Sequence, residues 1–129
     1  MMKKTPMQIS GHYAGFPEKT LVIIMNHERA RIFHAHGHDF TEQQTLQSPS
    51  CGSLDEACIK EFFCLVHKRM EQALKKEDVV EFLVCVPEIH RPLFQDHTPQ
   101  PLLKKIQRLV PKNLSAMEEG PIVRILFEG

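Results

Sequence analysis

The stretch Leu21-Val22-Ile23-Ile24-Met25-Asn26-His27-Glu28-Arg29-Ala30-Arg31-Ile32-Phe33-His34-Ala35-His36 decides the fold of this chain. The unbroken apolar run at residues 21–25 is typical of a strand that is covered on both faces. Residues 26–28 are a polar break, and from residue 29 the side chains alternate between two faces of an extended chain. The stretch therefore predicts a β-hairpin with strands at residues 21–26 and 29–36.

The segments that follow the hairpin predict a crossover unit. Residues 37–39 suit a turn, residues 40–47 a polar third strand at or near a sheet edge, and residues 48–52 a loop. Ser53 with Glu56 is a capping-box pattern, and apolar residues at helical spacing up to residue 74 predict a long amphipathic helix. A second apolar strand is expected at residues 79–86. The strand–helix–strand order predicts that this strand is parallel to the strand at residues 21–26, in one sheet.

Both ends of the chain have weaker patterns. We expect a short helix at residues 88–97, a helix at residues 101–109, a short strand at residues 110–114 and a capping box at Ser115 and Glu118. Residues 122–127 favour a terminal helix over a strand. Residues 1–19 are predicted to be a loosely ordered arm, with an edge strand at residues 7–9 or an oligomer contact as alternatives. Residues 20–129 are predicted to form one α/β domain, with helices flanking a mixed sheet of about five strands.

Composition excludes several classes of protein. The 129 residues include 16 basic and 16 acidic ones, and this balance argues against a dedicated nucleic-acid binder, although local basic patches remain open. No segment has the length and apolarity of a signal peptide or a membrane span. Cys58, Cys64 and Cys85 lie in apolar patterns and are predicted to be small buried side chains, which favours a reduced, cytoplasmic compartment. No cofactor is expected, because the phosphate-binding, dinucleotide-binding and serine-nucleophile motifs are missing.

Several segments carry a family resemblance. They are Asn-His-Glu-Arg-Ala-Arg-Ile-Phe at residues 26–33, the helix around Phe62, Phe-Leu-Val-Cys-Val-Pro at 82–87, Pro-Leu-Phe at 92–94, Leu-Leu-Lys-Lys-Ile at 102–106 and Val-Pro-Lys-Asn-Leu-Ser at 110–115. In this order and spacing they resemble the bacterial host attachment protein family. That family is itself similar to the middle domain of archaeal and eukaryotic peptide-chain release factors. The last segment looks like the family's closing strand, with Lys-Asn-Leu-Ser in place of a Lys-Asp-Leu-Thr pattern.

The resemblance implies an α/β domain with the ribosome or RNA as a partner, and the family name suggests a role in host contact. The loop that carries Gly-Gly-Gln in release factors matches residues 48–53, Ser-Pro-Ser-Cys-Gly-Ser, which have one glycine and no glutamine. Since release activity needs that amide side chain, we expect no peptidyl-tRNA hydrolysis. Ser50, Cys51 and Gly52 remain candidate binding residues in this loop.

Three further groups of residues suggest chemistry. His34 and His36 point the same way on a strand, and with His38 and a carboxylate from Asp39 or Glu42 they could bind a metal; the competing interpretation is a solvated strand end. Cys51 precedes a helix and could be an activated thiol or an incidental one. The most basic stretch is Lys104, Lys105, Arg108 and Lys112, with Arg124 beyond, and it could contact rRNA phosphates or be a solvated helix face. Arg29 and Arg31 are expected to pair with Glu28 or Glu42.

The sequence thus favours a non-enzymatic α/β binding module that contacts a macromolecule and no membrane. A divergent metal- or thiol-dependent hydrolase and a protein for attachment to host cells are the alternatives. A homodimer is left open.

Overall fold

The computed structural model describes residues 7–50 and 52–129. Within these residues, one sheet has the strand order β1-β4-β3-β2-β5-β6. Its strands are β1 (Met7–Gln8), β2 (Phe16–Met25), β3 (Arg29–Gly37), β4 (Asp39–Gln47), β5 (Glu81–Cys85) and β6 (Ile106–Val110). The helices are α1 (Glu56–Lys76), the 3-10 helix η1 (Glu88–His90), α2 (Arg91–His97), α3 (Gln100–Leu103) and α4 (Glu119–Glu128). The predicted α/β fold is confirmed, with six strands instead of about five.

Strand β2 lies in the middle of the sheet. It pairs antiparallel with β3 and parallel with β5, so that Ile23 has Ile32 on one side and Val84 on the other. All five side chains of residues 21–25 are completely buried. The predicted hairpin and its parallel pairing with the second apolar strand are therefore confirmed.

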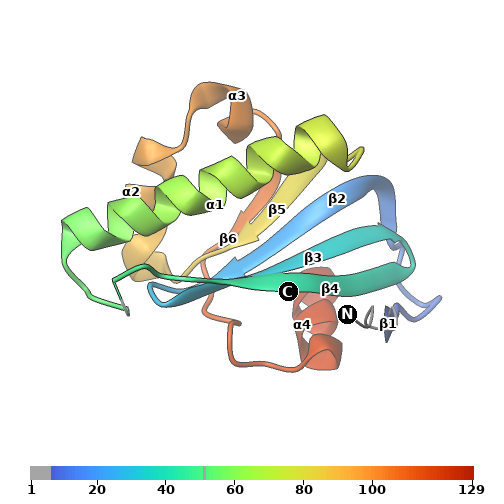
Figure 1. The fold of residues 1–129 in the computed structure, drawn as a ribbon. Helices are drawn as coiled ribbons and strands as arrows, with labels where there is room; N and C mark the ends of the chain where they lie inside the picture. Colours follow the sequence, from blue (N-terminus) through green and yellow to red (C-terminus); the bar gives the residue numbers. More distant parts are fainter. Residues whose placement is uncertain (1–6, 51) are drawn as a thin grey trace.

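Helices cover both faces of the sheet (Figure 1). The connections from β4 to β5 and from β5 to β6 move the chain in the same direction across the sheet. Right-handed connections that move in the same direction across a sheet place their helices on the same face of it. Helices α1, α2 and α3 accordingly lie on one face. Helix α4 lies on the opposite face, so alternate side chains of β2 enter two separate cores.

Each core is built from alternating strand residues and one group of helices. Ile23 and Ile32 pack with Phe62 of α1 in the α1-side core. Val22 and Phe33 lie in the α4-side core with Ile122, Val123 and Leu126 of α4. The Phe33 ring stacks on Phe40 with 4.6 Å between ring centroids. The predicted two-sided burial of β2 thus follows from one helix layer on each face.

The first part of the chain differs from the predicted loose arm. Residues 7 and 8 form β1, which pairs with β4 so that Met7 is opposite Phe40, and this agrees with the alternative of an edge strand at residues 7–9. Ile9 and Phe16 are buried in the α4-side core, and their burial fixes this otherwise polar segment against the sheet. A Cβ atom on Gly15, whose φ is +79°, would lie 2.5 Å from the carbonyl oxygen of Gly37, so only glycine fits here. Residues 1–6 of the predicted arm lie outside the described residues.

Helix α1 begins later than predicted. Asp55 is its N-cap and accepts a hydrogen bond from the backbone N–H of Ala57 at 2.9 Å, while Ser53 accepts one from the backbone N–H of Asp55. The predicted cap at Ser53 is wrong because the aspartate, two residues on, reaches the free N–H groups of the first turn. The prediction that Cys58 and Cys64 are buried is wrong, because Cys64 is exposed on α1 and Cys58 is only partly buried, whereas Cys85 is buried as predicted.

The segment after α2 was predicted wrongly. The helix expected at residues 101–109 ends at Leu103, and residues 106–110 form β6 beside β5. The edge of β5 decides this: the N–H groups of Phe82 and Val86 donate to the carbonyl oxygens of Lys105 and Val110. No strand is formed over residues 111–114, and Ser115 does not cap a helix, since α4 begins at Glu119. The terminal helix preferred for residues 122–127 is confirmed.

His67 joins α1 to the end of α2 inside the α1-side core. The hydroxyl of Thr98 donates to the carbonyl oxygen of Phe94 at 2.6 Å, so it must accept the hydrogen bond from Nε2 of His67 at 3.0 Å. His67 therefore carries a proton on Nε2. Burial lowers the pKa of His67 to about 4, with Glu71 opposing and His97 reinforcing this shift.

Replacing the α1 cap tests where the helix begins. Asp55→Ala is expected to lower the free energy of unfolding by about 1 kcal/mol, because the N–H of Ala57 loses its acceptor. Ser53→Ala is expected to cost less than half of this, and Asp55→Asn is expected to stay near wild type because asparagine is also a good cap. Urea unfolding followed by circular dichroism measures all three variants, and a larger loss in Ser53→Ala than in Asp55→Ala would contradict this assignment.

His67 predicts a pH dependence of stability. Because its pKa falls from 6.5 in the unfolded chain to about 4 in the fold, the unfolded state takes up the proton first as the pH falls. Its contribution is complete above pH 6.5 and is lost between pH 6.5 and 4, by at most about 3 kcal/mol. In His67→Gln, which keeps a donor for Thr98, this slope should be missing from unfolding curves measured over the same pH range. Parallel pH profiles of the two proteins would show that His67 is not the titrating group.

Candidate functional site

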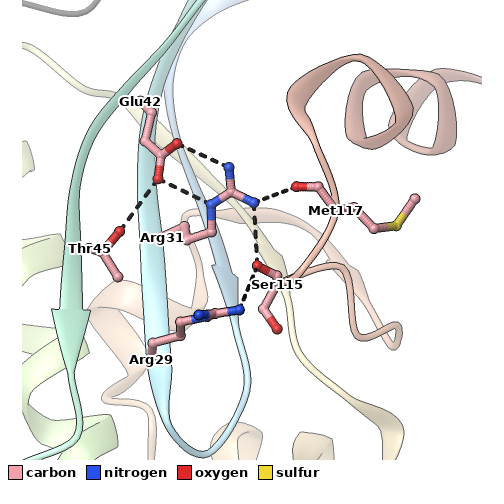
Figure 2. Close-up of polar contacts among 6 residues, drawn as sticks. All are labelled: Arg29, Arg31, Glu42, Thr45, Ser115 and Met117. Atoms are coloured by element: carbon pink, nitrogen blue, oxygen red, sulfur yellow. Dashed lines mark hydrogen bonds and ion pairs between the residues drawn. The ribbon is translucent and has the colours of Figure 1, made fainter.

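The principal polar network of the α4-covered face centres on Arg31 of β3 (Figure 2). Its guanidinium donates to both carboxylate oxygens of Glu42 on β4, with Nε–Oε2 at 3.1 Å and Nη2–Oε1 at 3.0 Å. The two side chains are only 15% and 8% exposed. A bidentate pair this well buried fixes both side chains, and the predicted pairing of Arg31 with Glu42 is confirmed.

The same guanidinium holds the segment between β6 and α4 against the hairpin. Nη1 of Arg31 donates to the carbonyl oxygens of Met117 at 2.6 Å and Ser115 at 3.3 Å. Nη2 of Arg29 reaches the same Ser115 oxygen at 3.4 Å, and the Asn26 amide donates to the Ser115 hydroxyl at 3.0 Å. The Ser115 hydroxyl in turn donates to Oδ1 of Asn113 at 2.7 Å. Two of the segments that carry the family resemblance, residues 26–33 and 110–115, therefore meet in one hydrogen-bond network.

A shallow groove runs beside this network. Its volume is about 400 Å³, and it is lined by Arg29, Arg31, Thr45, Gln47, Ser115 and Ala116. We call this the arginine groove. On the other side of Arg31 lies a second hollow of about 410 Å³ lined by Met7, Arg31, Glu118, Glu119 and Gly120. Arg31 thus lines both hollows. The second hollow contains the carboxylates of Glu118 and Glu119 in its lining, whereas the lining of the arginine groove contains no carboxylate.

The three candidate metal-binding histidines have different surroundings. Nε2 of His34 lies 2.6 Å from Oε1 of Glu77, His38 donates from Nε2 to the carbonyl oxygen of Tyr13, and His36 is exposed. Among residues 7–50 and 52–129, the structure has no group of three or more His, Cys, Asp or Glu side chains that could hold a metal ion. The structure therefore does not bring the three imidazoles together.

His34 belongs instead to a network under α1. Arg69 donates from Nη1 and Nη2 to both carboxylate oxygens of Glu77, at 2.8 and 2.9 Å, and from Nε to Gln44. Burial raises the pKa of Glu77, but the hydrogen bonds and charges of Arg69 and His34 outweigh it and hold that pKa below its usual value. This network joins the end of α1 to β3 and β4. The helical periodicity of α1 did not predict this network, because Arg69 is a charged residue on the face of the helix that is buried and otherwise mostly apolar.

The predicted basic stretch is divided between two places. Arg108 and Lys112 donate to the carbonyl oxygens of Leu126 and Gly129 at the end of α4, where cations are favoured by the helix dipole. Lys104 and Lys105 are exposed before β6, at the end of the sheet where the parallel strands begin. The structure thus separates the four residues that the sequence grouped.

Other lysines lie at the same end as Lys104 and Lys105. At the start of β5 the N–H of Val80, just before the strand, donates to the carbonyl oxygen of Lys19 on one side, and the N–H of Phe82 donates to that of Lys105 on the other. Two strand spacings, about 10 Å, therefore separate the two lysine backbones. Helix α1 ends a few residues before β5 with exposed Lys75 and Lys76. We call Lys19, Lys75, Lys76, Lys104 and Lys105 the amino-end lysines, after the amino ends of the parallel strands. The sequence alone does not predict this set, because its members are far apart along the chain.

The loop expected to match the release-factor catalytic loop lies against the β2–β3 turn. The N–H of Ser48 donates to the carbonyl oxygen of Glu28, and Ser50 is half-buried beside it. Gly52 has a φ of +79°, and a Cβ atom there would lie 2.6 Å from Cγ of Glu28. The loop is thus packed beside a carboxylate, and Cys51 lies outside the described residues.

Comparison with known proteins shows the fold. The solved structure of S. cerevisiae Dom34, a translation termination-like factor involved in RNA quality control pathways and interacting with Hbs1, is similar with a TM-score of 0.56 at 10% identity. The match covers 84% of this chain and 32% of the Dom34 chain, so this chain spans about a third of that protein. A selenomethionine-labelled Dom34 structure gives a TM-score of 0.49 at 11% identity, over 82% of this chain and 33% of that one. No family model and no curated protein matches.

No helix within residues 7–50 and 52–129 has the length and apolarity needed to span a membrane.

The Arg31–Glu42 pair is expected to be a main stabilising contact. Arg31→Met should lower the free energy of unfolding by about 3 kcal/mol, because it leaves the Glu42 carboxylate buried without its cation. Glu42→Gln should cost less, since an amide still accepts one hydrogen bond. In the double variant the losses should differ from the sum by at least about 1 kcal/mol. Chemical unfolding of the four proteins measures this, and additive losses would show that the two residues act independently.

Proposed function

We propose that this chain is a non-enzymatic α/β binding module of the bacterial host attachment protein family, and that it associates with the ribosome or RNA in the cytoplasm. The Dom34-like fold supports this proposal, because Dom34 is a translation termination-like factor. The ordered segments that resemble the host attachment family are a second ground for it. The contact between residues 26–33 and 110–115 adds to this support, since it gives both segments a shared role in the fold.

The amino-end lysines are the surface that we propose for phosphate contacts. Lys104 and Lys105 are exposed, and no hydrogen bond or ion pair of the described residues occupies their ammonium groups. Arg108 and Lys112 are less available, because they bind the end of α4. A chain with no net charge can still bind a phosphate backbone through one cluster of cations, and such binding weakens as salt rises.

We propose that this association involves no hydrolysis of peptidyl-tRNA. The loop at residues 48–53 has no glutamine, and Gly52 packs on Glu28. Ser50, Cys51 and Gly52 are kept as candidate contacts within the same complex.

Charge reversal at the amino-end lysines tests this function. Lys104→Glu/Lys105→Glu should lower the affinity for ribosomes, measured by co-sedimentation, and for a mixed-sequence RNA, measured by fluorescence anisotropy, by at least about 10-fold. It should also flatten the salt dependence of RNA affinity, because two cation–phosphate contacts are lost.

A matched control carries the same change in charge elsewhere. Lys60→Glu/Lys68→Glu alters two cations on α1 that belong to no candidate site and should bind like wild type. Equal binding by all three proteins would remove the amino-end lysines from the proposal. Failure of the wild-type chain to bind ribosomes and RNA at low salt would overturn the function itself.

A further inference from the structure

The side chain of Arg29 is held less firmly than its neighbour Arg31. Arg31 is neutralised by Glu42 and donates to two carbonyl oxygens as well. The only side-chain hydrogen bond of Arg29 among the described residues is a long one, 3.4 Å from Nη2 to the Ser115 carbonyl oxygen. No ion pair of the described residues includes it.

Arg29 also has an unsatisfied donor. Its Nε is buried and has no hydrogen-bond partner among the described residues. A buried N–H without an acceptor is costly, and such groups are rare in folded proteins. An acceptor brought within reach of this Nε would therefore gain a hydrogen bond without displacing an existing one.

The backbone around Arg29 is fixed even though its side chain is not. Oδ1 of Asn26 accepts from the backbone N–H groups of Glu28 and Arg29, at 2.7 and 2.9 Å. The opposite wall is fixed by the bonds of Ser115 to Asn26, Asn113 and Arg31. A rigid groove with one weakly held cation is a suitable receptor for an anion, because little besides that side chain has to move.

We propose that the arginine groove binds a phosphate group of a nucleotide, with the Nε and Nη donors of Arg29 on two phosphate oxygens. A guanidinium matches an oxyanion with two parallel hydrogen bonds. The lining of the groove contains no carboxylate, and the exposed Gln47 amide supplies a further donor, whereas the hydroxyls of Thr45 and Ser115 already donate to Glu42 and Asn113. The groove, about 400 Å³ in volume and largely open to solvent, is larger than a bare phosphate, so the remainder of the nucleotide can lie along it.

This inference does not depend on the proposed function. The groove lies where β3 begins and β4 ends, whereas the amino-end lysines lie where β5 and β6 begin, at the opposite end of the sheet. A ligand here is either a free nucleotide or a nucleotide of an RNA strand, and both present the same phosphate.

The test follows the Nε–Hε NMR signal of Arg29, assigned by its loss in Arg29→Lys. Titration of the full chain with inorganic phosphate, adenosine monophosphate and a short oligoribonucleotide should move this signal to saturation, with adenosine monophosphate at least about 10-fold tighter than phosphate. Arg29→Lys keeps the charge but loses the planar donors, so it should weaken each affinity at least about 10-fold, as measured by isothermal titration calorimetry on this variant and on the wild-type chain. Tighter binding of the oligoribonucleotide than of the monophosphate would identify an RNA strand as the source, and the reverse order a free nucleotide.

The controls separate site binding from screening and from loss of fold. Arg124→Lys, at an exposed position of α4, should bind as wild type, and Gln47→Ala, an exposed residue of the groove, should weaken adenosine monophosphate without changing the unfolding midpoint. Lys104→Glu/Lys105→Glu should still bind adenosine monophosphate, which separates failure of this site from failure of the proposed function. A signal that does not move, or that moves equally in potassium chloride of matched ionic strength, would overturn the proposal.

Discussion

The structure depends on the burial of β2 on both faces. Residues 21–25 place five apolar side chains alternately above and below the sheet, and each is completely buried. A strand of this kind requires neighbours on both sides and a helix layer on each face. Strands β3 and β5 supply the neighbours, α1 covers one face, and α4 covers the other. The remaining elements connect or extend this arrangement.

Covering the second face creates the polar network around Arg31. Strand β3 alternates, so Arg31 points to the same face as Phe33 and is covered when the segment before α4 closes over it. A covered guanidinium needs acceptors, and Glu42, Met117 and Ser115 provide them. The network therefore fixes the closing segment to the hairpin and, as a consequence, forms one wall of the arginine groove.

The sequence predicted those parts of the fold that a single segment determines. The apolar run at residues 21–25, the alternation after it and the long amphipathic helix each specify their own structure, and all three are confirmed. The predicted helix at residues 101–109 was wrong for its second half. Residues 106–110 have no clear hydrophobic periodicity, and they become a strand because they pair with the edge of β5. The cap at Asp55 was missed because Ser53 offered an equally good local pattern. Local sequence cannot show either competition, since its outcome depends on a neighbour.

The candidate sites were harder to predict than the fold because they join distant parts of the chain. Four cations between Lys104 and Lys112 looked like one surface, but β6 and the end of α4 separate them into an exposed pair and a pair that caps a helix. In contrast, Lys19 and Lys105 are far apart in the sequence and are brought near each other by their pairing with β5. Arg29 and Arg31 are only two residues apart, yet Glu42 neutralises Arg31 alone. In a chain without net charge, the placement of such unpaired cations decides where an anionic partner can bind.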